Sequence, residues 1–106
     1  MPAQARLGDK STGEGCFPPT SIISGVSSTV FVNGIAAAVI GSQLAPHTCG
    51  MVTHAGSSRQ VVAGSSTVSF DGKKAARIGD AIADGDLIAA GSGNVFTGWI
   101  NNRWQR

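Results

Sequence analysis

The sequence has few of the residues that build a large core: no tyrosine, two tryptophans and four phenylalanines among its 106 residues. Charged residues make up only 13% of the chain, and the formal net charge is +2. The basic residues form no stripe and are not interleaved with aromatic residues, so we do not expect nucleic-acid binding. No run of about 18 apolar residues is present, so we expect no membrane-spanning helix.

Two further absences concern export and cross-linking. The first ten residues, MPAQARLGDK, lack the apolar segment of a cleavable signal peptide, and we therefore expect no such signal. The chain has only two cysteines, Cys16 and Cys49. In a sequence without a secretion signal, two cysteines do not indicate a disulfide framework.

Glycine, in contrast, is abundant. The chain has 15 glycines, about twice the usual share of roughly 7%. Together with frequent serine and threonine, this composition predicts short strands joined by tight turns. The length fits one domain. A domain this small buries only about two thirds of its unfolded surface, so a staple such as a metal ion would help to stabilise it.

The strongest feature of the sequence is an internal repeat, in which two short elements each occur three times. The first element is a serine-led strand and turn, found at 27-SSTVFVNG-34, 65-SSTVSFDG-72 and 92-SGNVFTG-98. The second is a turn motif, found at 5-ARLGD-9, 38-AVIGS-42 and 76-ARIGD-80. Three similar units in one chain predict a pseudo-threefold arrangement.

The secondary structure that this repeat predicts is all-β. Short apolar segments are expected to be strands, at 21-SIISG-25, 60-QVVAG-64 and 87-LIAAG-91. A second strand in each unit is expected to end in a tight turn, at Asn33-Gly34, Asp71-Gly72 and Thr97-Gly98. Asn-Gly and Asp-Gly favour hairpin turns because both turn positions need positive φ. The alanine-rich run 36-AAAVI-40 is also interpreted as strand, since it overlaps the repeated turn motif.

The loops that follow the turn motif differ in length and carry the reactive side chains. They are 10-KSTGEGCFPPT-20, 43-QLAPHTCGMVTHAGSSR-59 and 81-AIADG-85. The middle loop is the longest and holds His47, Cys49 and His54. In a threefold arrangement the loops gather at one end, where Cys16 would meet the middle loop. A metal site, part of a catalytic site and an ordinary loop are all compatible with these residue types.

The repeated motifs resemble those of the PAAR-repeat proteins. The resemblance rests on 2-PAQARLGD-9 and 73-KKAARIGD-80, with the degenerate 35-IAAAVIGS-42 between them, and it covers residues 2–98. It implies a small, cone-shaped, all-β domain with a metal-tied vertex. We place that domain at residues 1–98 and a short tail at residues 99–106, in which we expect no effector domain.

The resemblance also implies a function. PAAR-repeat proteins cap the threefold end of a trimeric β-helical spike in contractile injection machines. The chain is thus expected to be a non-enzymatic, membrane-piercing structural tip, at the tip of a phage tail spike or in the bacterial cytoplasm before type VI secretion. Its expected partners are a VgrG-like or phage central spike, effector cargo where present, and the target-cell envelope on penetration. The free protein is expected to be a monomer.

Two other functions remain open from the sequence. The first is an adaptor that attaches toxin cargo to the spike. The second is a small zinc-dependent hydrolase that acts on an envelope. A catalytic Cys–His pair would need an orienting group and a substrate cleft, and a domain of short strands is not expected to offer such a cleft.

One structural zinc ion is the cofactor that the resemblance implies. A structural zinc site takes four cysteine or histidine ligands, and the chain offers Cys16, His47, Cys49 and His54. Many PAAR-repeat proteins have a ligand histidine where this chain has Glu14, so Glu14 is an alternative to Cys16. A disulfide between Cys16 and Cys49 is a competing interpretation, because the two cysteines occupy equivalent positions of the repeat.

The third loop and the tail are not expected to contribute ligands. The third loop has Gly85 and Leu87 at the aligned positions. Its neighbouring carboxylates are interpreted as turn caps, at Asp80, Asp84 and Asp86. Two tryptophans in the tail, Trp99 and Trp104, are expected to pack on the domain or to contact a partner.

Overall fold

The computed structural model describes residues 2–13 and 15–98, without the side chain of residue 57. Within these ranges the chain is almost entirely β, as predicted. The strands are β1 (Ile22–Ser24), β2 (Phe31–Val32), β3 (Ile35–Ala36), β4 (Gln43–Leu44), β5 (His47–Cys49), β6 (Val52–His54), β7 (Ser69–Phe70) and β8 (Lys73–Lys74). The one helical element among the described residues is η1, a 3-10 turn at Gly56–Ser58.

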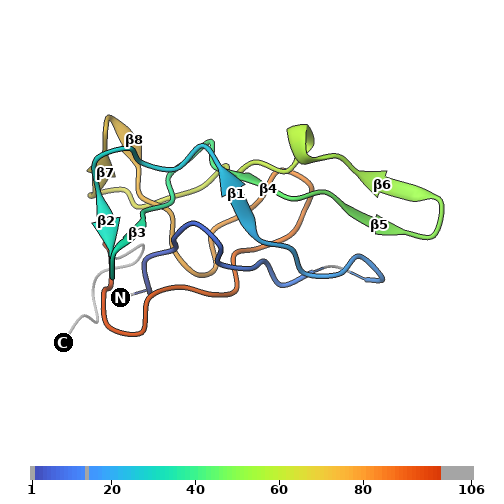
Figure 1. Ribbon diagram of the computed structural model, residues 1–106, viewed down its shortest axis with the longest axis horizontal. Coiled ribbons are helices and arrows are strands. Elements are labelled where there is room, and N and C mark those ends of the chain that lie inside the picture. Colours follow the sequence, from blue (N-terminus) through green and yellow to red (C-terminus); the bar gives the residue numbers. More distant parts are fainter. Residues whose placement is uncertain (1, 14, 99–106) are drawn as a thin grey trace.

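The strands form four antiparallel pairs, β1 with β4, β2 with β3, β5 with β6 and β7 with β8. The β5–β6 hairpin projects at one end of the molecule, and the β2–β3 and β7–β8 hairpins lie toward the other end (Figure 1). The segments predicted as strands at 60–64 and 87–91 make isolated bridges instead, such as Val61 to Ile82 and Ser11 to Ile88. Neighbouring residues there bridge to different partners, as Gln60 does to Gln43 and Val61 to Ile82, so no longer ladder forms.

The core is small and repeats the same positions of the sequence. Its buried residues are Ala5, Ile22, Ala38, Leu44, Val61, Ala76, Ile82 and Ile88. Three of them, the alanines of the turn motif, are joined by backbone hydrogen bonds. Ala38 donates to Ala5, Ala5 donates to Ala76, and Ala76 donates to Ala38, at 2.9–3.0 Å. These hydrogen bonds close a ring in the middle of the core, and side chains larger than alanine would crowd it.

The serine-led element folds in the same way in each copy. Ser27, Ser65 and Ser92 are buried. Each hydroxyl oxygen accepts hydrogen bonds from the amides two and three residues ahead, at 2.9–3.2 Å. This local pattern is typical of serine, whose short side chain reaches nearby backbone amides. The serines thereby fix the chain just before each hairpin.

The hairpin turns are as predicted in two copies, and the third copy differs among the residues that the structure describes. Asn33 and Asp71 have φ of 57° and 55°, and the glycine after each has φ of 79°. Gly98 has φ of 50° and therefore stands where Asn33 and Asp71 stand. The predicted turn at Thr97-Gly98 was wrong, because Thr97 does not have the positive φ that such a turn needs and the prediction matched glycine to glycine.

The turn motif forms what we call the Arg–Asp clips, Arg6–Asp9 and Arg77–Asp80. In each clip an aspartate oxygen accepts a hydrogen bond from the arginine amide, and both oxygens accept from the guanidinium, at 2.7–3.1 Å. The degenerate middle copy keeps only the backbone part: Val39 donates its amide to the Ser42 hydroxyl, at 3.0 Å. The repeated motif thus encodes a local turn whose side chains close it.

Candidate metal centre

The histidines are brought together by the β5–β6 hairpin. His47 lies opposite His54 in the register, and Cys49 lies opposite Val52. Side chains at alternate positions of a strand share a face, so His47 and Cys49 lie on the same face of β5. The predicted proximity of the two histidines is therefore a property of this one hairpin.

A carboxylate from the third loop completes the cluster. Nε2 of His47 is 2.9 Å from Nδ1 of His54 and 3.1 Å from Oδ2 of Asp84. Nδ1 of His54 is also 3.1 Å from Oδ2 of Asp84. We call His47, His54 and Asp84 the tip cluster. Two imidazole nitrogens and a carboxylate oxygen thus converge on one point.

The second nitrogen of His47 is fixed by the first loop. Nδ1 of His47 lies 2.9 Å from the carbonyl oxygen of Pro18. Because a carbonyl only accepts, Nδ1 carries the proton, which leaves Nε2 facing His54 and Asp84. The ring of Phe17 stacks on that of His54, with centroids 3.9 Å apart. The first loop therefore sets both the tautomer of one histidine and the ring plane of the other.

Asp84 is held in place by a buried arginine. Nε of Arg59 donates to Oδ2 of Asp84 at 2.8 Å, and another guanidinium nitrogen donates to Oδ2 of Asp86 at 2.7 Å. The Arg59 side chain is fully buried and also donates to the Ala45 carbonyl at 2.7 Å and to the Thr20 hydroxyl. The guanidinium thus links the first, middle and third loops.

These contacts keep the two aspartates ionised. Burial by itself would raise the pKa of Asp84 and is the largest single influence on it, but the hydrogen bonds from Arg59 and from the Asp86 amide, together with the neighbouring positive charge, outweigh it, so the pKa lies below its ordinary value. Burial likewise acts against ionisation of Asp86. Hydrogen bonds from the Ser11 and Thr12 hydroxyls bring the pKa of Asp86 below its ordinary value. Asp84 is therefore an anionic carboxylate at neutral pH, the form that could bind a metal ion.

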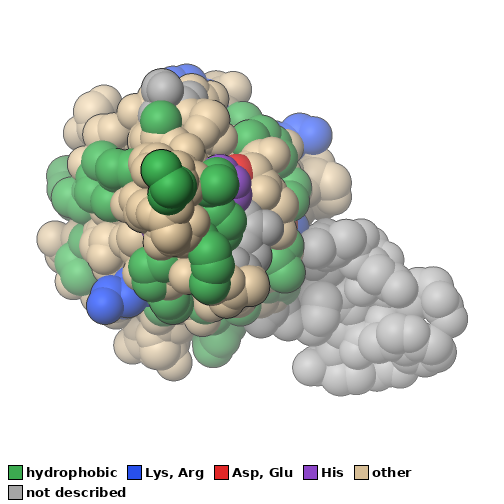
Figure 2. Space-filling view, turned by 90° about the vertical axis from the view of Figure 1, so that its right-hand side faces the viewer, with side chains coloured by type: hydrophobic (Ala, Val, Ile, Leu, Met, Phe, Trp, Pro, Cys, Tyr) green, Lys and Arg blue, Asp and Glu red, His purple; other side chains and the backbone are tan. Residues whose placement is uncertain are grey.

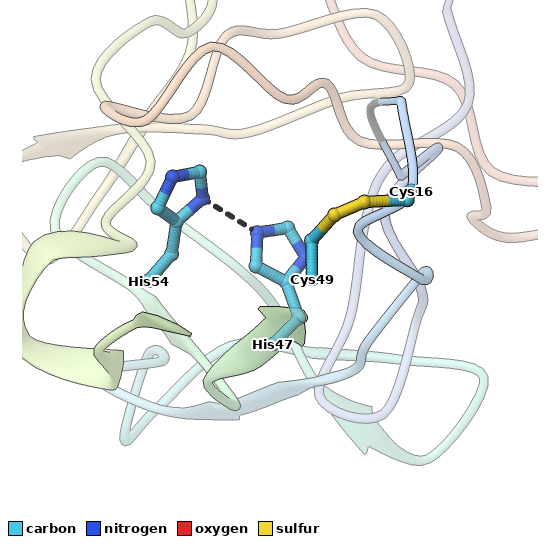
Figure 3. Close-up of a disulfide and its surroundings, with 4 residues drawn as sticks. All are labelled: Cys16, His47, Cys49 and His54. Atoms are coloured by element: carbon cyan, nitrogen blue, oxygen red, sulfur yellow. Dashed lines mark hydrogen bonds between the residues drawn. A yellow bond between two sulfur atoms is a disulfide. The ribbon is translucent and has the colours of Figure 1, made fainter. Parts of the chain in front are cut away.

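The two cysteines are joined to each other. Cys16 and Cys49 form a disulfide with their Cα atoms 5.3 Å apart, within the usual range for such bonds. The disulfide lies beside the His47–His54 pair (Figure 3). A thiolate is the form of cysteine that binds metals, so the paired cysteines offer no thiolate in this state. The set Cys16, His47, Cys49 and His54 stays a prediction for the reduced chain, and Glu14 lies outside the described residues.

The tip cluster has donors that suit zinc. Imidazole nitrogen and carboxylate oxygen are both common zinc ligands, and ligands about 2.0 Å from a tetrahedral ion lie roughly 3.3 Å apart. The donor atoms of the cluster are 2.9–3.1 Å apart, which is close to that ligand–ligand distance. The Pro18 carbonyl on the far side of His47 is the outer partner that zinc-binding histidines usually have. Three donor atoms that suit zinc are therefore brought together.

Sequence reasoning missed Asp84 and Arg59. The third loop was expected to supply no ligand, but the structure places Asp84 of this loop beside the two histidines, where it could serve as one. The expected capping role of Asp84 holds as well, since its other oxygen accepts the amide of Asp86 at 3.3 Å. Asp80, Asp84 and Asp86 stand close together in the sequence and could have been considered as ligands. Only the fold shows which of these aspartates turns toward the histidines.

The surroundings of the cluster and the comparisons with known proteins add further findings. A cavity of about 400 Å³ is lined by Gly15, Cys16, Phe17, His54 and Asp84. Among the described residues, no helix has the length and apolar character needed to cross a membrane. A family model described as the PAAR motif matches residues 12–90. No curated protein matches the sequence.

Proposed function

Because the chain belongs to the PAAR-motif family, we propose that it caps the threefold end of a trimeric β-helical spike and carries one structural zinc. The family is one of structural spike-tip proteins of contractile injection systems. The proposal adds three points for this chain: how a monomer matches a trimer, which end docks, and which end meets the target envelope.

A single chain matches a homotrimer by offering three similar edges. The observation that carries this part is the closed ring of hydrogen bonds among Ala5, Ala38 and Ala76. Each alanine comes from the same position of one copy of the turn motif. The three buried serines before the hairpins support the same arrangement. We therefore propose that the three copies are related by a pseudo-threefold axis through the alanine ring.

The docking end is proposed to be the one that carries the β2–β3 hairpin. Phe31 in β2 and Phe96 occupy the same position of the repeat, and their side chains are 59% and 49% exposed. Exposed aromatic side chains and short strand edges suit docking on a β-helical partner. The β2–β3 hairpin lies away from the β5–β6 hairpin (Figure 1), so docking there leaves the tip cluster clear of the spike.

The opposite end is proposed to meet the envelope. Figure 2 faces this end and shows apolar side chains around the histidine and acidic atoms, with basic side chains toward the edge of the view. Met51, at the turn of the β5–β6 hairpin, is fully exposed, and Val52 beside it is more than half exposed. A projecting hairpin without charged residues can enter an apolar layer at low cost in desolvation.

Zinc would stiffen this end. His47 and His54 belong to the hairpin, and an ion held by them together with a residue of another loop ties the hairpin to the rest of the domain. Metal binding to a site that exists only in the folded chain adds its binding free energy to folding. Such a tie gives rigidity that a core rich in alanine cannot.

Docking is tested by mixing the protein with a purified homotrimeric β-helical spike and measuring the mass of the complex. We expect one chain per trimer. The double variant Phe31→Asp/Phe96→Asp should lose binding while its circular dichroism stays unchanged. The matched control is Met51→Asp at the other end, which should bind normally. Loss of binding in the Met51 variant alone, or a ratio of three chains per trimer, would overturn the docking model.

A further inference from the structure

Within the tip cluster, Asp84 contacts both the histidines and a buried arginine, Arg59. One of its carboxylate oxygens, Oδ2, faces both histidines at 3.1 Å and Arg59 Nε at 2.8 Å. Arg59 is buried and is also paired with Asp86. The carboxylate therefore has a cation to neutralise it whether or not it binds a metal. Such a ligand can join or leave a metal site without being left as an unpaired buried charge.

The two cysteines lie beside the tip cluster (Figure 3). Cys16 lines the same cavity as His54 and Asp84. Cys49 is two residues from His47, on the same face of β5. While the disulfide is closed, neither sulfur is a thiolate. Once the disulfide is reduced, two thiolates become available next to the two imidazoles. Thiolate is a softer ligand than carboxylate and binds zinc more strongly.

Building on the metal centre proposed above, we infer that the redox state of Cys16 and Cys49 selects the ligands at this tip. With the disulfide closed, His47, His54 and Asp84 bind the ion, and the fourth position is open. With the disulfide reduced, Cys16 and Cys49 join His47 and His54, and Asp84 returns to Arg59 alone. The chain then changes from an open three-ligand site to a closed four-ligand site.

The chemistry of the exchange balances with an external dithiol. Thiol–disulfide exchange breaks the Cys16–Cys49 bond, and the dithiol passes two electrons and two protons to the protein as it becomes a cyclic disulfide. Each cysteine then loses its proton to solvent as its sulfur binds the ion. Reoxidation reverses these steps with a disulfide as the acceptor. The histidines remain ligands throughout, so the ion need not leave the protein.

Cobalt(II) is a suitable probe, because its absorption reports the ligands directly. The purified chain is titrated with cobalt(II) and, separately, with zinc, with the disulfide closed and after treatment with a dithiol. We expect one ion per chain in both states. A near-ultraviolet sulfur-to-cobalt charge-transfer band should appear only after reduction, together with tighter binding.

Two variants assign the ligands. Asp84→Asn keeps an oxygen that can accept from Arg59 but loses the anionic ligand. In the oxidised state it should weaken cobalt binding by more than the roughly 10–100-fold typical of an outer-shell change. In the reduced state it should alter affinity far less. The matched control is Asp71→Asn in the β7–β8 turn, which should leave both affinities unchanged.

The variant Cys16→Ser/Cys49→Ser should bind cobalt without a charge-transfer band, with or without prior treatment with the dithiol, which is removed before cobalt is added. Equal sensitivity to Asp84→Asn in both states would overturn the exchange while leaving the metal centre intact. So would a charge-transfer band in the oxidised protein. Absence of zinc and cobalt binding in either state would overturn the metal centre and the exchange together.

Discussion

The two ends of this molecule are built by different means. The end that carries the β2–β3 and β7–β8 hairpins is made from repeated elements, and each serine turn and Arg–Asp clip is closed by hydrogen bonds between residues two or three apart. The tip is made once, from three loops of unequal length. Its contacts join distant residues, such as His47 and Asp84, 37 positions apart. Repetition builds the body of the protein, and departure from repetition builds its candidate site.

The difference also concerns charge. The Arg–Asp clips pair one arginine with one aspartate of the same turn, whereas Arg59 at the tip serves two aspartates from another loop. A clip can lose both charged partners together and keep a turn of the same length, as Val39 and Ser42 show. The Arg59 network cannot be reduced in this way, because removing one member leaves charges buried without a partner.

The largest effect should therefore come from Arg59→Leu. This change leaves Asp84 and Asp86 without their cation, and breaking a buried pair typically costs about 3–5 kcal/mol. We expect a loss of this size in the free energy of unfolding of the oxidised, metal-free protein, measured with urea. The comparison is Arg6→Leu in the more exposed clip, which should cost about 1 kcal/mol. Equal losses of unfolding free energy in the two variants would show that Arg59 is no more important for stability than the arginine of a clip.

A smaller effect is expected from opening the disulfide that joins two of the tip loops. Cys16 and Cys49 are 33 residues apart, and a cross-link over a loop of this order typically contributes about 2–4 kcal/mol. The double variant Cys16→Ser/Cys49→Ser should lose that amount in the absence of metal. Reduction of the wild-type protein should have the same effect, and addition of zinc should restore stability to the reduced wild type but much less to the variant.

The body can be tested with two glycines of one copy. A Cβ at Gly91 would lie 2.8 Å from the carbonyl oxygen of Gln4, whereas one at Gly93 would meet nothing within 4 Å. Gly91→Ala should therefore cost about 1–3 kcal/mol through overpacking, and Gly93→Ala should change stability by no more than about 0.5 kcal/mol. Thermal unfolding of the two variants side by side measures the difference. A similar cost at both positions would contradict close packing of the copies at Gly91.

The smallest effect should be the pH dependence of stability that comes from Asp71, in the turn between β7 and β8. Hydrogen bonds from the hydroxyls of Ser27 and Thr29 hold the pKa of Asp71 below its ordinary value. The ionised form therefore stabilises the fold above the ordinary pKa, and that contribution is lost as the pH falls through the lowered pKa. Wild type should melt higher than Asp71→Asn near neutral pH, and the gap should close in acid. A gap that does not vary with pH would assign the effect to packing.

Local chemistry explains how much of the fold could be predicted. The Asn-Gly and Asp-Gly turns and the all-β composition follow from residues that are near one another in the chain, and they hold in the structure. The third turn was wrong because Thr97 does not have the positive φ of the asparagine or aspartate in the other copies. The pairing of His47 with His54 follows from the short connection between them, which closes a hairpin.

By itself the sequence determined the repeat, the turns and clips, and the family, because hydrogen bonds between residues two or three apart need no distant partner. Only the tertiary structure decided that Asp84 turns toward the histidines, that Arg59 is buried beneath it, and that Cys16 reaches Cys49. These contacts depend on how three loops of different length come together at one end. Their geometry is set by the packed body below them and is not encoded in any loop alone.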